Sequence, residues 1–574
     1  MIWILAVFFP LVAAFFCLLP GKGFLSGRLL MVCAPLPALF MALSGQHDQG
    51  IELNNFLLQS RLGFTPWGRE LLTAISIVWA GSSIYAAFGR WNLTRSFAVM
   101  FLLSMCGNLG LIVSLDAISF YLFFALMTFS SYPLIIHSRE EHTIRAGRIY
   151  LIMAVLGEGL LLAGLMTSVA LTGSHYFSDI HLTMATVPET HPVFAMLFAG
   201  FGIKAGLVFL HFWLPLAHPA APVPASAVLS GAMIKAGLAG WMFFFPLGMA
   251  DFGLWAIILS VMGITGTFWG VLAGMAETRP KVILAFSSIS QMGLMTFCFG
   301  QGLFMESLWV MAGPAMVYLI MNHALCKATL FLQTGISMRI SSGYAGLIKV
   351  LSIIPALSLA GAPFTAGIQA KYLLKDVAGQ GPFGSISSWI LSLSSVLTTI
   401  LLTHFFSCLE KTSISGKSDA AKYSSWLVMI LTVLVLPFTI HHFQPDLRPY
   451  LLNSSTVISG LWPVISGIAI YIFFSRFISR KAARTVNALP VLAELLEKAW
   501  YHLNSRIRQS RVLGSEQVSM NFSQYTDMII SSRLAVKISR GLEKKFYSWT
   551  VFGLFFMVSI LFFIFLAWIG QFNS

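Results

Sequence analysis

The chain has 574 residues, of which 57% are hydrophobic and only 10% are charged. A soluble domain contains roughly 25% charged residues, so this composition excludes a soluble enzyme. The net charge is +14. The six cysteines occur singly in apolar runs, without a CxxC pair or the spacing of metal ligands. We therefore expect no disulfide framework, no iron–sulfur site, and no metal or other cofactor.

Apolar runs of about 20 residues, bounded by charge, Gly or Pro, predict an all-α membrane protein with sixteen transmembrane spans. No connection between them is long enough for a soluble domain of about 100 residues. The first run has no basic residue before it, so we expect a span there and not a cleaved signal. The expected spans are residues 1–20, 26–45, 69–88, 95–115, 116–137, 148–172, 193–216, 224–250, 252–276, 281–299, 305–335, 346–375, 385–408, 423–442, 455–478 and 549–570.

Lysine and arginine are distributed unevenly among the connections between these spans. The odd-numbered connections before the tail hold fourteen of the 35 basic residues, the even-numbered ones hold four, and the segment between spans 15 and 16 holds thirteen. Because cytoplasmic loops carry the excess of positive charge, both termini are expected on the non-cytoplasmic side of a plasma membrane. This alternation accounts for the net charge and argues against a nucleic-acid partner.

The remaining four basic residues are lysines inside the expected spans: Lys204, Lys235, Lys327 and Lys371. A lysine at the centre of a membrane costs about 2.5–3.5 kcal/mol, and its usual explanation is a functional group facing a polar interior. Lys204 and Lys235 lie near the middle of their spans, which disfavours snorkelling to the interface. For Lys371, near the end of span 12, snorkelling stays open as an alternative.

Two regions of the chain predict broken helices. Four prolines fall within residues 215–224, and an intact helix does not accommodate them, so spans 7 and 8 are separated or interrupted there. Span 12 contains Pro355 and a Gly-Ala-Pro run ending at Pro363, before Lys371. Irregular backbone inside a membrane is tolerated where it lines a hydrated cavity. Interrupted spans five apart, each with a lysine, predict two inverted five-helix repeats with breaks in helices 7 and 12.

Four stretches carry a resemblance to a known family: Lys204–Gly237, Leu284–Gly293, Asn322–Leu332 and Ala360–Lys371. Together they resemble the antiporter-like proton-translocating subunits shared by respiratory complex I, membrane-bound hydrogenases and Mrp-type cation/proton antiporters. The His-Pro-Ala-Ala-Pro run that starts at His218 is most similar to the hydrogenase-associated branch. The sixteen-span layout is more similar to the largest complex I subunit of this type, whose last span follows a lateral helix.

The resemblance implies an ion relay, for protons or sodium, coupled to a redox or ion-exchange partner. It implies that Lys204 is the switching lysine of a first half-channel and Lys235 the central lysine. His323 and Lys327 would link the halves, and Lys371 would be the exit lysine. The spacing of His323 and Lys327 places them on one helical face. The implied partners are other membrane subunits, together with the lipid bilayer.

The sequence departs from the family at one important position. The family has a glutamate in span 5 as the ion-pair partner of the span 7 lysine, and this chain has Ala125 there. The nearest alternative is Glu158 in the middle of span 6, where an unpaired carboxylate is as costly as a lysine. We therefore expect Glu158 to pair with Lys204, directly or through water.

Three further residues have two interpretations each. His211 and His218, beside the predicted break, either belong to the ion pathway or pack the helix break. Asp116, at the start of span 5, is either a pathway residue or an interfacial helix cap. The same holds for His323, to which the resemblance assigns a role in the relay and for which simple packing is the alternative.

The tail before the last span predicts a long amphipathic helix. Leu489, Leu492, Leu496 and Trp500 recur at helical spacing. At 1.5 Å per residue, a helix over 485–545 would extend about 90 Å. It would lie on the lipid surface or, as the resemblance favours, along neighbouring subunits. The expected organisation is 1–94 (spans 1–3), 95–250 (first repeat), 251–408 (second repeat), 409–478 (spans 14 and 15), 479–548 (cytoplasmic amphipathic or lateral helix) and 549–574 (last span).

Three hypotheses from different classes follow. An ion-translocating subunit of a larger complex is favoured by the buried lysines and broken helices. A redox enzyme in its own right is disfavoured, because the sequence has no Gly-rich nucleotide loop, no cysteine cluster and no paired histidines suited to haem. A structural or partner-anchoring subunit without conduction stays open because of Ala125. The sequence does not name the driving reaction.

Overall fold

The computed structural model is almost entirely helical over the residues that it describes, which are 2–44, 50–53, 59–187, 190–336, 345–412, 419–443 and 454–475. All of them belong to one unit, Met1–Val486. The expected lateral helix and the sixteenth span lie outside the described residues, so both stay predictions.

The N-terminal part holds four helices and a small hairpin. The helices are α1 (Ile2–Leu18), α2 (Lys22–Cys33), α3 (Leu36–Ser44) and α4 (Gly68–Phe88). The antiparallel hairpin pairs β1 (Ile51–Leu53) with β2 (Ser60–Leu62).

The next segment begins with two helices whose first turns are capped by side chains. Thr94 accepts a hydrogen bond from the Phe97 amide at the start of α5, and Asp116 accepts one from the Ser119 amide at the start of α6. Such caps satisfy amides that have no partner within the helix. The helices are α5 (Arg95–Val113), α6 (Ala117–Ile135), α7 (Glu141–Thr172), α8 (Phe177–Thr186), α9 (His191–Ala205), α10 (Leu214–Ala220), α11 (Val223–Val228), the π-helical turn η2 (Leu229–Met233) and α12 (Lys235–Phe244).

The second half of the described unit is again helical. It consists of α13 (Gly253–Met275), α14 (Pro280–Gly302), the short 3₁₀ turn η3 (Glu306–Leu308), α15 (Trp309–Gln333), α16 (Ala345–Ala360), α17 (Ala366–Gln380), α18 (Ile386–Thr412), α19 (Ala420–Phe443) and α20 (Ser454–Ser475).

The expected all-α polytopic membrane fold is confirmed. Twelve helical segments in the described part of the chain are long and apolar enough to cross a membrane. Three shorter apolar helices lie at expected spans 1, 7 and 12; they are Ile2–Leu18, His191–Ala205 and Gly346–Ala360. Spans 7 and 12 are short for the same reason, because each is divided by a break. The total of sixteen spans and the inverted repeats stay predictions.

The two breaks have the same local backbone geometry. After α9, Gly206 and Phe209 both adopt positive φ, at 73° and 70°, and after α16, Gly361 and Phe364 do so at 82° and 63°. A phenylalanine at positive φ is uncommon and strained, so its recurrence three residues after each glycine is a specific similarity. It supports the prediction of two repeats. Span 8 is interrupted as well, by the π-helical turn at Leu229–Met233.

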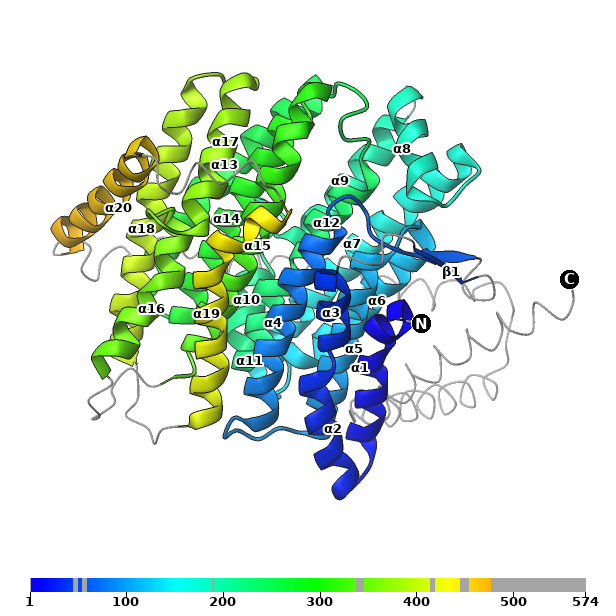
Figure 1. Ribbon diagram of the computed structural model, residues 1–574, viewed down its shortest axis with the longest axis vertical. Coiled ribbons are helices and arrows are strands. Elements are labelled where there is room, and N and C mark those ends of the chain that lie inside the picture. The colour runs from blue at the N-terminus through cyan, green and yellow to red at the C-terminus, as the bar shows by residue number, and fades with distance from the viewer. Residues whose placement is uncertain are drawn as a thin grey trace, which may run out of the picture. The chain divides into compact units, whose positions relative to one another are not determined.

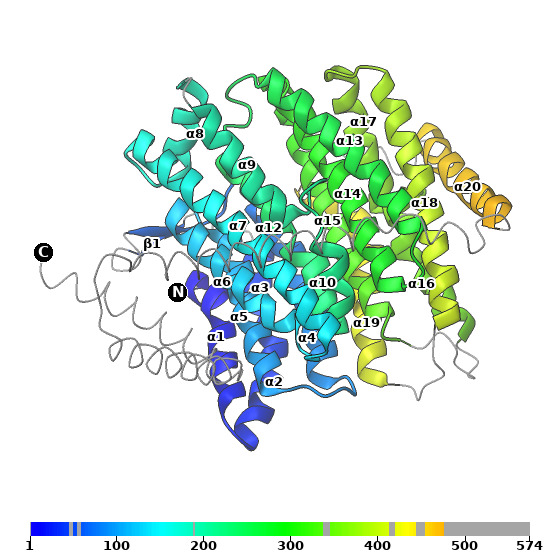
Figure 2. The same cartoon turned by 180° about the vertical axis from the view of Figure 1, so that it is seen from behind.

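The central helices of this unit are α12, α14 and α15. Figures 1 and 2 both show α5–α9 on one side of them and α16, α18 and α20 on the other. The apolar centres of α14 and α15 are wholly buried, and α15 packs against α4, α14, α16, α17 and α19. Side chains on α12 and α15 therefore lie between the two halves that contain the breaks.

Candidate functional site

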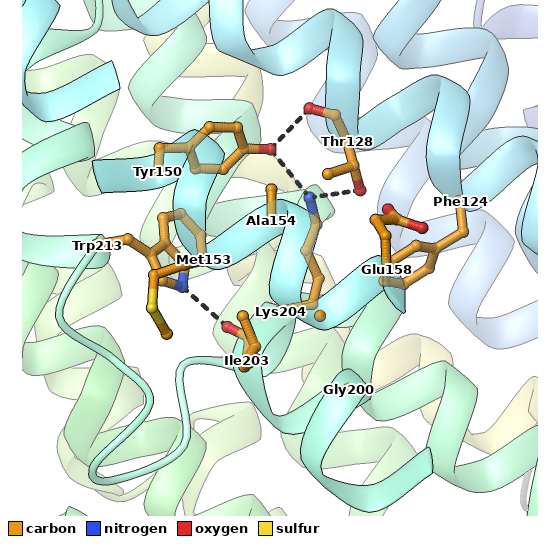
Figure 3. Close-up of a pocket in the computed structure, with 11 residues that line it drawn as sticks. Phe124, Thr128, Tyr150, Met153, Ala154, Glu158, Gly200, Ile203, Lys204 and Trp213 are labelled. Atoms are coloured by element: carbon orange, nitrogen blue, oxygen red, sulfur yellow. Dashed lines mark hydrogen bonds between the residues drawn. The ribbon is translucent and has the colours of Figure 1, made fainter. Parts of the chain in front are cut away.

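The Lys204 side chain points from the end of α9 into a pocket lined by residues of α6 and α7 (Figure 3). Its Nζ donates to Thr128 Oγ1 at 3.2 Å and to the Tyr150 hydroxyl at 3.3 Å. The Tyr150 hydroxyl in turn donates to the Thr128 carbonyl at 2.8 Å. Lys204 is only 5% exposed, and it sits in the last turn of α9, where the helix dipole favours a cation. The break after α9 thus holds its lysine in the interior.

Glu158 lines the same cavity from α7, as Figure 3 shows, beside Phe124. It is 5% exposed, and neither carboxylate oxygen lies within hydrogen-bond distance of a partner among the described residues, although the side chain of Thr128 is near enough to stabilise its charge. Glu158 and Lys204 attract each other electrostatically, although the described structure contains no direct ion pair between them. The cavity of about 20 Å³ exceeds the roughly 10–15 Å³ needed for one water. A water in it would have the carboxylate and the ammonium as its polar partners.

A hydrogen bond from a side chain to a backbone carbonyl fixes the loop after the first break. Trp213 Nε1 donates to the Ile203 carbonyl at 2.8 Å, and this carbonyl lies in the last turn of α9, where helix carbonyls lack an intrahelical partner. The Trp213 indole also packs edge-on against the Tyr150 ring. The break is therefore tied to the residues that contact Lys204.

The central group consists of Lys235, His323 and Lys327, on α12 and α15. Lys235 Nζ donates to the Ser230 carbonyl at 2.6 Å and shares a 2.5 Å hydrogen bond with His323 Nδ1. The other ring nitrogen of His323 is buried and has no partner in the described part of the chain. Lys327 Nζ donates to the Leu284 carbonyl at 3.2 Å. All three side chains are buried.

Two serines connect Lys235 with Lys327. Ser230, whose carbonyl accepts from Lys235, has its hydroxyl 2.8 Å from that of Ser288. The Ser288 hydroxyl donates to the Leu284 carbonyl at 3.0 Å, the same carbonyl that accepts from Lys327. The π-helical turn supplies both polar atoms of Ser230, so the interruption of span 8 contributes directly to this connection.

Lys371 lies on α17, after the second break, and its amine turns back into the protein. Nζ donates to the Ala360 carbonyl at 3.0 Å and to Ser395 Oγ at 2.8 Å. Ala360 is the last residue of α16, so the ammonium lies at the negative end of that helix. A second cavity of about 20 Å³ lies here, lined also by Lys375 and Ser392. These contacts disfavour the snorkelling interpretation of Lys371.

Several polar residues of the site were missed from the sequence. Thr128 and Tyr150 hold Lys204, and Ser395 holds Lys371. Between His323 and Lys371, the Ser358 hydroxyl donates to Asn322 Oδ1 at 2.6 Å. Their only feature in the sequence is a hydroxyl or amide group within an apolar span. Such groups are common in helices, where they often form hydrogen bonds with backbone groups of the same helix, so they do not indicate a functional site.

The three residues with two interpretations have different surroundings. Asp116 is a helix cap, accepting from the Ser119 amide and hydroxyl and from the Arg61 amide, at 2.7–2.9 Å. His211 accepts from Trp269 Nε1 at 3.3 Å, beside the first break. His218 is buried, and neither ring nitrogen has a partner among the described residues. Helix capping thus accounts for Asp116. His211 and His218 both stay open, because the Nδ1 atom of His211 is also buried without a partner among the described residues.

The comparison with protein families gives the class of the protein. Residues 114–402, which are half of the chain, match the family described as "NADH:quinone oxidoreductase/Mrp antiporter, TM". This range contains both breaks, Glu158 and all four buried lysines. The chain therefore belongs to this family of antiporter-like membrane subunits.

Individual relatives lie in two branches of the family. The chain is 33% identical over 247 residues to "Hydrogenase-4 component B" of Escherichia coli (strain K12), covering 42% of this chain and 36% of that one. It is 28% identical over 424 residues to the "Putative antiporter subunit mnhA2" of Staphylococcus saprophyticus, covering 70% of this chain and 50% of that one. The chain thus spans about a third to a half of the length of these curated relatives.

Two solved structures share the fold. The Mrp complex from Dietzia sp. DQ12-45-1b matches with a TM-score of 0.70 and 20% identity, over 94% of this chain and 62% of that chain. The membrane-bound sulfane sulfur reductase, an archaeal respiratory membrane complex, matches with a TM-score of 0.63 and 18% identity. This match covers 82% of this chain and 98% of that chain. Both matches come from multisubunit membrane complexes.

Proposed function

We propose that this antiporter-like subunit translocates protons, or alternatively sodium ions, through a buried relay, coupled to a redox or ion-exchange partner. The relay begins at Glu158 and Lys204, passes Lys235, His323 and Lys327, and ends at Lys371. The observation that carries the proposal is the unpartnered Glu158 carboxylate in the cavity of Lys204. It supplies the negative charge that Ala125 lacks.

The first step of the relay is a change in the charge of Lys204. Burial away from water disfavours its ammonium form, whereas a nearby carboxylate favours it. Glu158 and Lys204 line the same cavity, which has room for a water. The polar groups of Thr128 and Tyr150 accept or donate hydrogen bonds in either protonation state of the lysine. A rearrangement that separates the pair would therefore release the ion toward Lys235.

The second step depends on the central group. The hydrogen bond between Lys235 and His323 provides a route for a proton from amine to imidazole, and the two ring nitrogens of a histidine can take up and release protons on opposite sides. His323 Nε2 has no partner among the described groups, which leaves it free to bond water. The serine chain between Lys235 and Lys327 offers a further polar connection.

The partners of this chain are proposed from its relatives. Those relatives are named as a hydrogenase component and an antiporter subunit, and the subunit fold recurs in two multisubunit complexes. We propose that this chain likewise works beside other membrane subunits, in a plasma membrane, with both termini on the non-cytoplasmic side. The charge distribution over its connections supports that orientation.

The test is ion flux through vesicles that contain the chain in its native complex, with Glu158→Gln. The amide preserves the size of the side chain and removes its charge, so flux should fall sharply while the amount of folded complex is unchanged. Glu70→Gln is the control, because Glu70 is a partly buried glutamate on another span and does not line the Lys204 cavity. Normal flux with Glu158→Gln would favour the structural or partner-anchoring function instead.

A further inference from the structure

A cluster of six phenylalanines separates the Lys204 cavity from a much larger cavity at the ends of the helices. The larger one, which we call the outer cavity, has a volume of about 440 Å³. Its lining includes Trp67, Tyr176, Phe177, Phe243 and Trp309. These residues lie at the start of α4, before and at the start of α8, near the end of α12 and at the start of α15. The distribution of basic residues assigns these connections to the non-cytoplasmic side.

The Phe120 ring lies between the walls of the two cavities. Its centroid lies 5.9 Å from that of Phe124, which lines the Lys204 cavity. On its other side, its centroid lies 6.2 Å from those of Phe177 and Phe243, which line the outer cavity. A single ring therefore spans the distance between the wall of one cavity and the wall of the other.

Two more phenylalanines close the layer around Phe120. Phe201 lies 5.7 Å from Phe120 and 5.9 Å from Phe124, and Phe244 lies 5.0 Å from Phe120 and 4.7 Å from Phe177, all as distances between ring centroids. The rings around Phe120 meet it mostly edge to face, an arrangement that aromatic pairs favour. All six side chains are buried. Their rings carry no hydrogen-bonding group, so the layer offers no polar partner to a water.

We propose that these six phenylalanines, centred on Phe120, are a dry barrier that closes the Glu158–Lys204 site to the outer cavity. A proton crosses a protein interior along water or polar groups, and side chains of the layer supply neither. A subunit that moves ions against a gradient needs such a seal, because an open route from the outer cavity to Lys204 would let the ions flow back. The proton on Lys204 then does not return to the outer cavity through this layer. This inference rests on the proposed ion translocation.

The barrier makes a prediction for the resting complex. Phe120→Ala removes the whole ring that joins the two walls, and the freed space connects a cavity that already has room for a water with the outer cavity. Passive proton permeability of vesicles that contain the idle complex should rise severalfold. Phe120→Leu, which keeps an apolar side chain in place, should leave the permeability close to that of the unaltered protein.

Two controls separate a specific leak from loss of structure. Phe101→Ala removes a buried ring of α5 whose ring neighbours are Trp79 and Phe97 and which lines neither cavity, so it should not leak. Adding Glu158→Gln and Lys204→Ala to Phe120→Ala should abolish the leak, since the route runs through that pair. If Phe120→Ala does not assemble, Phe243→Ala opens the same layer from the outer side.

The outcomes distinguish this inference from the proposed function. The barrier is supported if Phe120→Ala leaks and if adding Glu158→Gln and Lys204→Ala suppresses the leak. The proposed relay is tested separately: it is contradicted if Glu158→Gln alone leaves the turnover-driven flux normal, and this result does not affect the barrier. An unchanged permeability in assembled Phe120→Ala and Phe243→Ala complexes overturns the barrier. A leak that persists without Glu158 and Lys204, or that Phe101→Ala reproduces, overturns it as well.

Discussion

Replacing Gly361 by alanine perturbs the second helix break and Lys371 at the same time. Gly361 has φ 82°, a left-handed conformation that costs a residue with a Cβ roughly 1–2 kcal/mol. A Cβ at this position would also lie 2.9 Å from Cδ of Lys371 and 3.6 Å from its Nζ. The backbone cost lowers the population of the correctly folded break, and the steric contact displaces the lysine from Ala360 and Ser395.

Gly173→Ala is the matched control for the backbone cost alone. Gly173 has a similar φ of 71° at the end of α7, but its Cβ would meet no heavy atom within 4 Å. Both variants should therefore lower the free energy of unfolding of the purified complex by about 1–2 kcal/mol, which is a factor of roughly 5–30 in the ratio of folded to unfolded protein. The thermal unfolding midpoint should fall by comparable amounts in the two variants. Only Gly361→Ala should also lose ion flux per folded complex. Equal flux in the two variants would refute a role of the Lys371 position in translocation.

Three shorter predictions concern other parts of the structure. Asp116→Ala should destabilise the protein by about 0.5–2 kcal/mol through loss of a helix cap and leave the flux per folded complex unchanged; a specific loss of flux would return Asp116 to the pathway. Tyr150→Phe removes a hydrogen-bond partner of Lys204 and should reduce flux with little change in thermal stability, whereas unchanged flux would show that Thr128 suffices. Ser510→Cys should react with a membrane-impermeant thiol reagent only from the cytoplasmic side, and labelling from outside would contradict the topology.

The membrane fold was predictable because its signals are strong and additive over many residues. Apolar runs and the alternation of basic loops define the spans without knowledge of their packing. The break at Gly361 was also predictable in position from the Gly-Ala-Pro run, whereas the break at Gly206 lies before the four prolines of residues 215–224 that predicted an interruption. Their backbone geometry was not predictable, because a positive φ at Phe209 or Phe364 follows from tertiary packing and has no signal in composition.

The charged residues of the candidate site were easier to predict than their partners. A lysine or glutamate inside a span is rare and costly. This cost singled out Lys204, whereas Glu158 was found as the nearest replacement for the family glutamate that is absent at Ala125. Thr128 and Tyr150, which contact or surround the Lys204 amine, are ordinary in apolar helices and become significant only when α6, α7 and α9 are packed together. The phenylalanines around Phe120 likewise come from α6, α8, α9 and α12, so no local pattern reveals that they form one layer.

The central claim is that the Glu158 carboxylate and Lys204 separate as the complex turns over, and infrared difference spectroscopy of the carboxylate measures this most directly. We predict a turnover-induced shift of a carboxylate band that is present in the unaltered complex, absent with Glu158→Gln and retained with Glu70→Gln. A spectrum in which Glu158→Gln leaves every carboxyl band unchanged would contradict the relay through Glu158 and Lys204.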